Sequence, residues 1–134
     1  MDSYKAGSGE LQILLSTDIS TIGLAGSRAT SFILGSGDPS VPIAHSVDAT
    51  GDIPVSAIGK PSQIKGRRIS IMSKIDLSIV GDLEDRKSEF NKLKAMYILD
   101  GGAEHLKEFE ACPDDITHAG DYTTVLIFKT IDII

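Results

Sequence analysis

The 134-residue chain has one cysteine, Cys112, and no tryptophan. A single cysteine excludes a disulfide within the chain, so no disulfide framework holds this fold together. Aromatic residues are limited to four phenylalanines and three tyrosines, so the core must be built mainly from Ile, Leu and Val. The scarcity of tryptophan and tyrosine also argues against carbohydrate binding, because sugars commonly stack on flat aromatic rings.

Long apolar runs are missing as well. No stretch approaches the roughly 18 apolar residues that a membrane-spanning helix needs. The first residues, MDSYKAGSGELQ, contain no apolar segment behind a basic region. We therefore expect no secretion signal and no membrane partner, and we expect the protein in the cytoplasm or within an assembled particle.

Positive charge is in deficit, because 19 acidic residues against 13 basic residues give a net charge of −6. A chain with this balance has no global field to attract nucleic acid, so no nucleic-acid partner is expected. One local basic group remains, in KPSQIKGRR, formed by Lys60, Lys65, Arg67 and Arg68. It is interpreted as a solvated loop or strand edge, with a phosphate or partner contact as the alternative.

Alternation of apolar and polar residues predicts most of the secondary structure, since strand side chains point to opposite faces in turn. The clearest case is RISIMSKIDLSIV, where every odd position from Ile69 to Ile79 except Ser73 is aliphatic. The segment 41–47 shows the same pattern and places His45 on its predicted core side. Further strands are predicted at 11–15, 29–35, 53–57, 93–99, 104–111 and 121–134.

Turn signals rich in glycine, proline and aspartate separate these runs, for example GSGDPS at 35–40 and DATGD at 48–52. A helix is favoured only near 83–92, with Asp82 as its N-cap. About eight short strands with so little helix predict an all-β fold. We expect residues 1–134 to form a single domain, an antiparallel two-sheet sandwich of jelly-roll-like or Greek-key type.

The stretch YILDGGAEHLKEFEACPDDITHAG, residues 97–120, comes closest to a chemical signature because it contains His105, Cys112 and His118. Zinc sites present Cys and His in closely spaced pairs, whereas six and five residues separate these three. Neighbouring carboxylates disfavour the thiolate that a catalytic cysteine needs. The stretch is therefore interpreted as turns, and no catalytic, cofactor or metal site is predicted. Whether the three side chains converge in space is left open.

The final segment, DYTTVLIFKTIDII, is apolar on both faces from Val125 to Phe128, as a central strand covered on both sides would be. It ends with Ile131, Ile133 and Ile134, where polar residues are more usual. These three isoleucines are predicted to form an interface.

These observations favour a non-enzymatic structural or assembly subunit that contacts copies of itself or other subunits. Its setting would be a homo-oligomer or a larger particle, for instance a viral or phage particle. The alternative is a small β-sandwich module that binds a small ligand or carbohydrate. An enzyme is not expected, because no acid–base or nucleophile constellation is recognisable.

Overall fold

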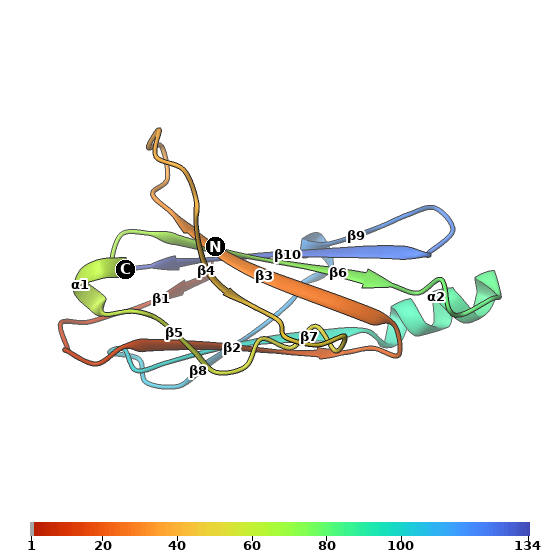
Figure 1. The fold of residues 1–134 in the computed structure, drawn as a ribbon, viewed down its shortest axis with the longest axis horizontal. Helices are drawn as coiled ribbons and strands as arrows, with labels where there is room; N and C mark the ends of the chain where they lie inside the picture. The colour runs from red at the N-terminus through yellow and green to blue at the C-terminus, as the bar shows by residue number, and fades with distance from the viewer. Residues whose placement is uncertain (1) are drawn as a thin grey trace.

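The fold consists of two β-sheets packed face to face, seen edge-on in Figure 1, in a computed structural model that describes residues 2–134. Sheet A has the strand order β1-β10-β6-β3-β4, with β9 also paired to β10, and sheet B has the order β5-β2-β7-β8. The predicted all-β two-sheet sandwich is confirmed. Sheet A comprises β1 (Asp2–Tyr4), β3 (Leu24–Phe32), β4 (Val41–His45), β6 (Arg68–Asp76), β9 (Ile116–His118) and β10 (Thr124–Ile133), and sheet B comprises β2 (Ile13–Ser20), β5 (Ser56–Gly59), β7 (Lys94–Asp100) and β8 (Lys107–Glu110).

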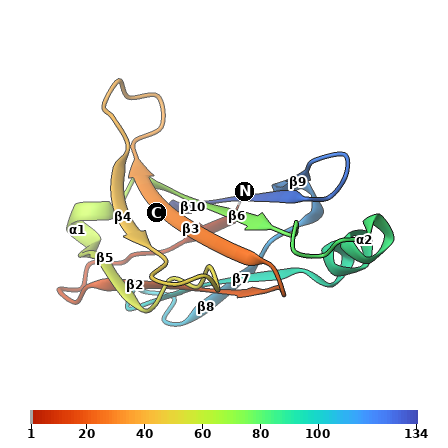
Figure 2. The ribbon, with the colours of Figure 1, turned by 45° about the vertical axis from the view of Figure 1, so that its right-hand side comes forward.

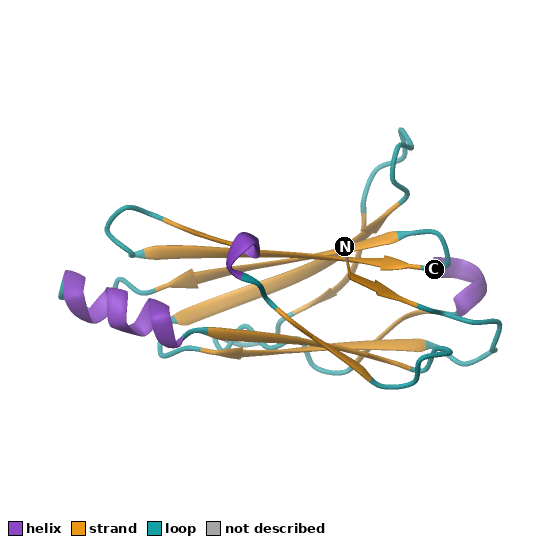
Figure 3. Cartoon of the chain, turned by 180° about the vertical axis from the view of Figure 1, so that it is seen from behind, coloured by secondary structure: helices purple, strands orange, loops and turns teal. Residues whose placement is uncertain are grey.

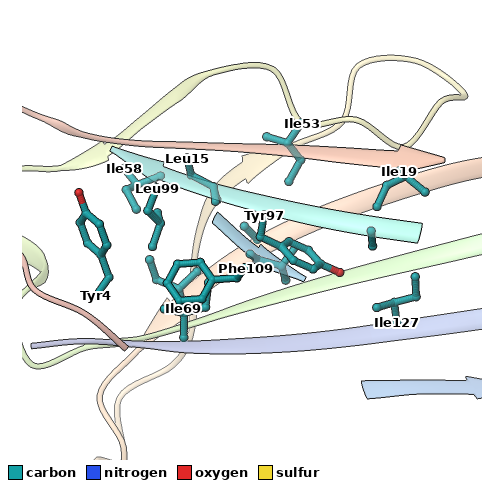
Figure 4. Close-up of a cluster of buried hydrophobic side chains, with 14 of the residues drawn as sticks. Tyr4, Leu15, Ile19, Ile53, Ile58, Ile69, Tyr97, Leu99, Phe109 and Ile127 are labelled. Carbon is teal, nitrogen blue, oxygen red and sulfur yellow. The ribbon is translucent and has the colours of Figure 1, made fainter. Parts of the chain in front are cut away.

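The core lies between the sheets and is mostly aliphatic, as the composition predicts (Figure 4). Strand β6 follows the alternation read from the sequence, with Ile69, Ile71 and Ile75 buried. Ser73, the exception in that pattern, is also buried, and its Oγ lies 2.6 Å from Oγ of Ser27 on β3. The two hydroxyls satisfy each other, so a polar position inside the core leaves no unpaired group.

Helix α2 (Leu83–Lys92) forms where the sequence predicts it. The carboxylate of Asp82 accepts hydrogen bonds from the amides of Glu84 and Asp85 and so caps the helix as expected. Two single turns, α1 (Pro61–Ile64) and η1 (Pro113–Asp115), accompany it, each with proline in its first turn. Figure 3 shows α2 and α1 at opposite ends of the sandwich. None of the described helices has the length and apolar character needed to cross a membrane.

Residues 2–134 form ten strands instead of about eight. The two extra strands, β1 and β9, have three residues each, which is too short for alternation to reveal. β1 is also the exception to the antiparallel pattern, because it pairs in parallel with the end of β10.

The prediction that His45 faces the core is wrong, because its side chain is exposed. It lies on the edge strand β4, where every residue from Val41 to His45 is exposed or only partly buried.

Strand β10 is covered on one face only, so the expectation of cover on both faces is wrong for the chain by itself. Val125 and Ile127 on its inner face are buried between the sheets. On its outer face Leu126 is 40% exposed and Phe128 is 52% exposed.

The burial of β10 generates a stability prediction. Replacing Ile131, which is fully buried, by alanine should lower the free energy of unfolding by about 2–5 kcal/mol, because a cavity is left in the core. The matched control is Ile134→Ala, since half of the Ile134 side chain is exposed, and it should cost less than about 1 kcal/mol. Urea unfolding measures both, and equal losses would contradict the register of β10.

Candidate functional site

The outer face of sheet A carries exposed apolar side chains at its centre. Leu126 and Phe128 are two residues apart on β10 and therefore point to the same side. Phe128 lies directly opposite Met72 of β6, whose side chain is only half-buried. We call Met72, Leu126 and Phe128 the outer apolar patch. Leu24 of β3 is exposed on the same face.

Cations border the outer apolar patch. Lys74 of β6 lies directly opposite Leu126 of β10. Arg28 of β3 lies directly opposite Met72 of β6. Both side chains are exposed. Gly26, opposite Lys74, has no side chain and leaves a hollow between these two cations. The patch therefore offers a partner an apolar centre beside positive charge.

The loop 33–40 between β3 and β4 stands out from the sandwich on the side of sheet A (Figures 1 and 2). It begins with Ile33 and Leu34, both exposed. Gly35 follows in a left-handed conformation with φ of 76°, and the amide of Ser36 donates to the carbonyl of Ile33. The loop thus holds two apolar side chains in solvent beyond the sheet.

Two of the three predicted interface isoleucines lie in the chain's own core. Ile131 and Ile133 point between the sheets and are fully buried. The amide of Ile134 donates to the carbonyl of Tyr4, and its own carbonyl accepts from the amide of Ala6, which extends the pairing with β1. Of the three, only Ile134 has an exposed side chain, and an interface role for it stays a prediction.

The predicted basic group is divided between two roles. The Arg67 guanidinium donates to the hydroxyl and the carbonyl of Ser31, at 2.5 and 3.2 Å. Arg68 makes a two-pronged ion pair with Asp132, at 2.7 and 3.2 Å. This hydrogen bond holds the pKa of Asp132 below its usual value. Lys60 and Lys65 remain exposed, so the two lysines are the members left for a phosphate or partner contact.

His105 and Cys112 belong to turns, as the sequence interpretation has it. His105 is exposed in the turn that follows β7, with a left-handed backbone (φ 57°), and its amide donates to the carbonyl of Gly102. Cys112 is exposed at the start of η1, where its amide donates to the Asp115 carboxylate at 2.8 Å. Within residues 2–134, no three His, Cys, Asp or Glu side chains are grouped so that they could hold a metal ion.

His118 takes part in an aromatic cluster that fastens α2 to the β9–β10 hairpin. Its ring stacks on Tyr122 at 4.1 Å between centroids, and Phe90 of α2 packs edge-on against both rings. Arg86 adds hydrogen bonds to the carbonyls of Asp121 and Val80. His118 therefore has a packing role at the end of the sandwich.

A buried lysine forms a polar centre inside the sandwich. Lys129 of β10 points inward, with 3% of its side chain exposed. Its ammonium group lies 2.5 Å from the Asp2 carboxylate and 3.5 Å from the Asp115 carboxylate, and it donates to the carbonyl of Glu110 at 2.9 Å. Burial alone would lower the pKa of Lys129, but the hydrogen bond with Asp2 and the charges of Asp115 and Asp2 outweigh it and raise the pKa.

The Lys129 centre holds segments together rather than activating an amine. It connects β10 to β1 through Asp2, to η1 through Asp115 and to β8 through Glu110. A paired ammonium with a raised pKa is a poor nucleophile, because attack needs the free amine. The sequence carried a signal for this residue that the sequence analysis missed: Lys129 is in phase with Val125 and Ile127, and so on the core side of the strand.

Tyr97 places a further polar group in the core. Its hydroxyl is buried and has no hydrogen-bond partner among the described residues. Burial, reinforced by the charge of Asp115, raises the pKa of Tyr97, so the hydroxyl stays neutral. An unpaired buried hydroxyl costs stability.

Comparison of the chain with known protein families, with curated proteins and with solved structures found no match. The functional argument therefore depends on the arrangement of the residues described above.

The Lys129 centre generates a stability prediction. Lys129→Met keeps an unbranched side chain but removes the charge, leaving the half-buried Asp115 carboxylate without its cation. We expect a loss of about 2 kcal/mol at pH 7, less than for a fully buried pair because Asp2 and Asp115 retain solvent contact. Urea unfolding measures the loss, and Lys94→Met at an exposed position is the control.

The difference in stability between the parent protein and Lys129→Met should depend on pH. The pKa of Lys129 is higher in the folded than in the unfolded chain, so its contribution is complete below the unfolded value, about 10.4, and is lost as pH rises through the folded value. The stability difference between the parent and Lys129→Met should thus be constant from pH 7 to 9 and shrink above about pH 10.4. A difference that grows with rising pH would contradict the ion pairs.

Proposed function

We propose that this protein is a non-enzymatic assembly subunit that associates with a second copy of itself through the outer face of sheet A. The observation that supports the proposal is the exposure of Leu126 and Phe128 on β10, a strand with neighbours on both edges. Apolar residues on both faces of a strand are typical of a sheet that is covered on both sides. Here sheet B covers the inner face of β10. In the proposed dimer, the second copy covers its outer face.

Burial of the outer apolar patch would give such a contact its driving force. Removing a phenylalanine or leucine side chain from water is worth roughly 1.5–3 kcal/mol when burial is complete. Contiguous exposed apolar residues with a polar rim are characteristic of protein–protein contacts. The projecting loop 33–40 adds Ile33 and Leu34 on the same side of the sandwich.

A second copy is a suitable occupant for chemical reasons. Two sheets can stack face to face about 10 Å apart, as sheets A and B themselves do. The outer face of sheet A carries a carboxylate as well as cations, because Asp76 is in phase with Met72 and Lys74 on β6, so a second copy offers Asp76 to the exposed Lys74 and Arg28 of its partner. A symmetric contact of this kind closes as a dimer, whereas added contacts through the loop could build a larger particle. The viral or phage setting stays a prediction.

The proposal predicts concentration-dependent association that depends on Phe128. The parent protein should form dimers or larger species by light scattering after size exclusion at roughly 10–100 µM, the range of a weak, standard-size contact. Phe128→Asp should remain folded, because the side chain is exposed, and should be monomeric at the same concentrations, because a charge would be buried in the contact.

The matched control is Ile79→Asp, which places the same charge at an exposed apolar residue in the turn after β6. It should associate as the parent does. A parent protein that is monomeric up to millimolar concentration would exclude the proposed function, and equal loss of association in both variants would move the contact away from sheet A.

A further inference from the structure

A groove beside the outer apolar patch opens along one side of the sandwich, and Arg28 borders both. It lies between β4 and β5, the edge strands of sheets A and B, which run beside each other in Figure 2. Its volume is about 450 Å³. Its lining includes Arg28, Pro42, Ile43, His45, Val47 and Pro54.

The groove is apolar apart from a few polar groups. Ile43 is half-buried at its floor, whereas Val47 is exposed at its rim. Pro42 and Pro54 add rigid apolar surface. No aromatic residue is among the described residues that line it, so a stacked sugar ring is disfavoured. An aliphatic group fits this lining better.

Arg28 supplies positive charge that the chain leaves unused. Of the four arginines, three are bound within the fold: Arg67 to Ser31, Arg68 to Asp132 and Arg86 to two carbonyls. The Arg28 side chain is exposed, and its guanidinium has no ion pair or hydrogen bond with any residue from 2 to 134. The described lining of the groove contains no carboxylate. In a chain of net charge −6, such an unpaired guanidinium is suited to an anionic ligand.

His45 stands beside this guanidinium. The β3–β4 register places it directly opposite Arg28. Its Nδ1 lies 2.8 Å from the carbonyl of Ser46, and since a carbonyl only accepts, Nδ1 carries the proton. In that tautomer Nε2 is an acceptor, so the contact with a carboxylate belongs to Arg28 and not to His45. The acid nearest in sequence, Asp48, is occupied by its own turn, where it accepts from the amide and hydroxyl of Thr50.

The backbone around the groove disfavours an added β-strand. Pro42 removes an amide from β4, and the pairings of β4 with β3 and of β5 with β2 both contain a register irregularity. These features are typical of edges protected against strand addition. A ligand is therefore held by side chains rather than by backbone pairing.

We propose that the groove between β4 and β5 binds a carboxylate attached to an aliphatic group, with the guanidinium of Arg28 as the anchor for the carboxylate. The ligand chemistry is shared by a free fatty acid and by a peptide that ends in an aliphatic residue. In both, the aliphatic part lies against Ile43 and Val47, and the carboxylate lies at Arg28.

The test is a titration of ¹⁵N-labelled full-length protein with octanoate, followed by amide chemical shifts. Octanoate should shift the amides of Arg28, Ile43–Val47 and Ser56, with roughly millimolar affinity for so small a ligand. 1-Octanol, which lacks the carboxylate, should bind at least about tenfold more weakly, since a charge-assisted hydrogen bond is lost. Equal affinity of the two, or shifts confined to other regions, would overturn the proposal.

Variants of Arg28 test whether its guanidinium binds the carboxylate, and a variant of another exposed cation is the control. Arg28→Gln should lower octanoate affinity about tenfold or more, and Arg28→Lys, which keeps the charge but not the planar fork, should fall between. Lys94→Gln, an exposed cation on sheet B, should bind octanoate as the parent does. Unchanged affinity in Arg28→Gln would overturn the role of Arg28.

A second titration distinguishes the two sources of the carboxylate. A tripeptide ending in leucine should shift the same amides, and its C-terminal amide should not. Binding of only the peptide or only octanoate would identify the source, whereas binding of neither overturns the proposal. Phe128→Asp should bind octanoate normally, because Phe128 does not line the groove, so failure of the assembly proposal leaves this one standing.

Discussion

Strand β10 links the beginning, middle and end of the chain through its hydrogen bonds. It pairs with β6 from Thr124 to Asp132, with β9 near its start and with β1 near its end. Its inner face closes the core with Val125, Ile127, Ile131 and Ile133. The remaining inner position holds Lys129, whose ion pairs attach β1 and η1. Changes on the inner face of β10 therefore reach segments far apart in the sequence.

The outer face of β10, in contrast, is exposed to solvent. A sandwich of two sheets covers one face of each sheet, and within residues 2–134 no third layer lies over Leu126 and Phe128. Polar residues there would be sufficient for folding, because the core is complete without the outer face. The apolar side chains, the cations beside them and the projecting loop 33–40 together favour contact with another copy.

Local patterns predicted the parts of the fold that local physics determines. The alternation around Ile69–Ile79 identified β6, and Asp82 with the residues after it identified α2. Three-residue strands such as β1 depend on long-range pairing, which alternation does not register. The burial of Lys129 also depends on distant partners, since Asp2 is 127 positions away in sequence. Arg28 stood out only once its lack of a partner was visible, because the sequence draws attention to clustered charges such as Arg67 and Arg68.

The central claim is that the outer apolar patch becomes covered when copies associate. Methyl NMR of protein labelled at isoleucine, leucine and methionine, diluted stepwise from about 1 mM to 10 µM, tests it residue by residue on the scale of a weak contact. The account predicts that the methyl signals of Met72 and Leu126 move with concentration, while those of the buried Leu99 and the exposed, distant Ile79 stay constant. Constant signals at Met72 and Leu126, or movement at Ile79 instead, would contradict it.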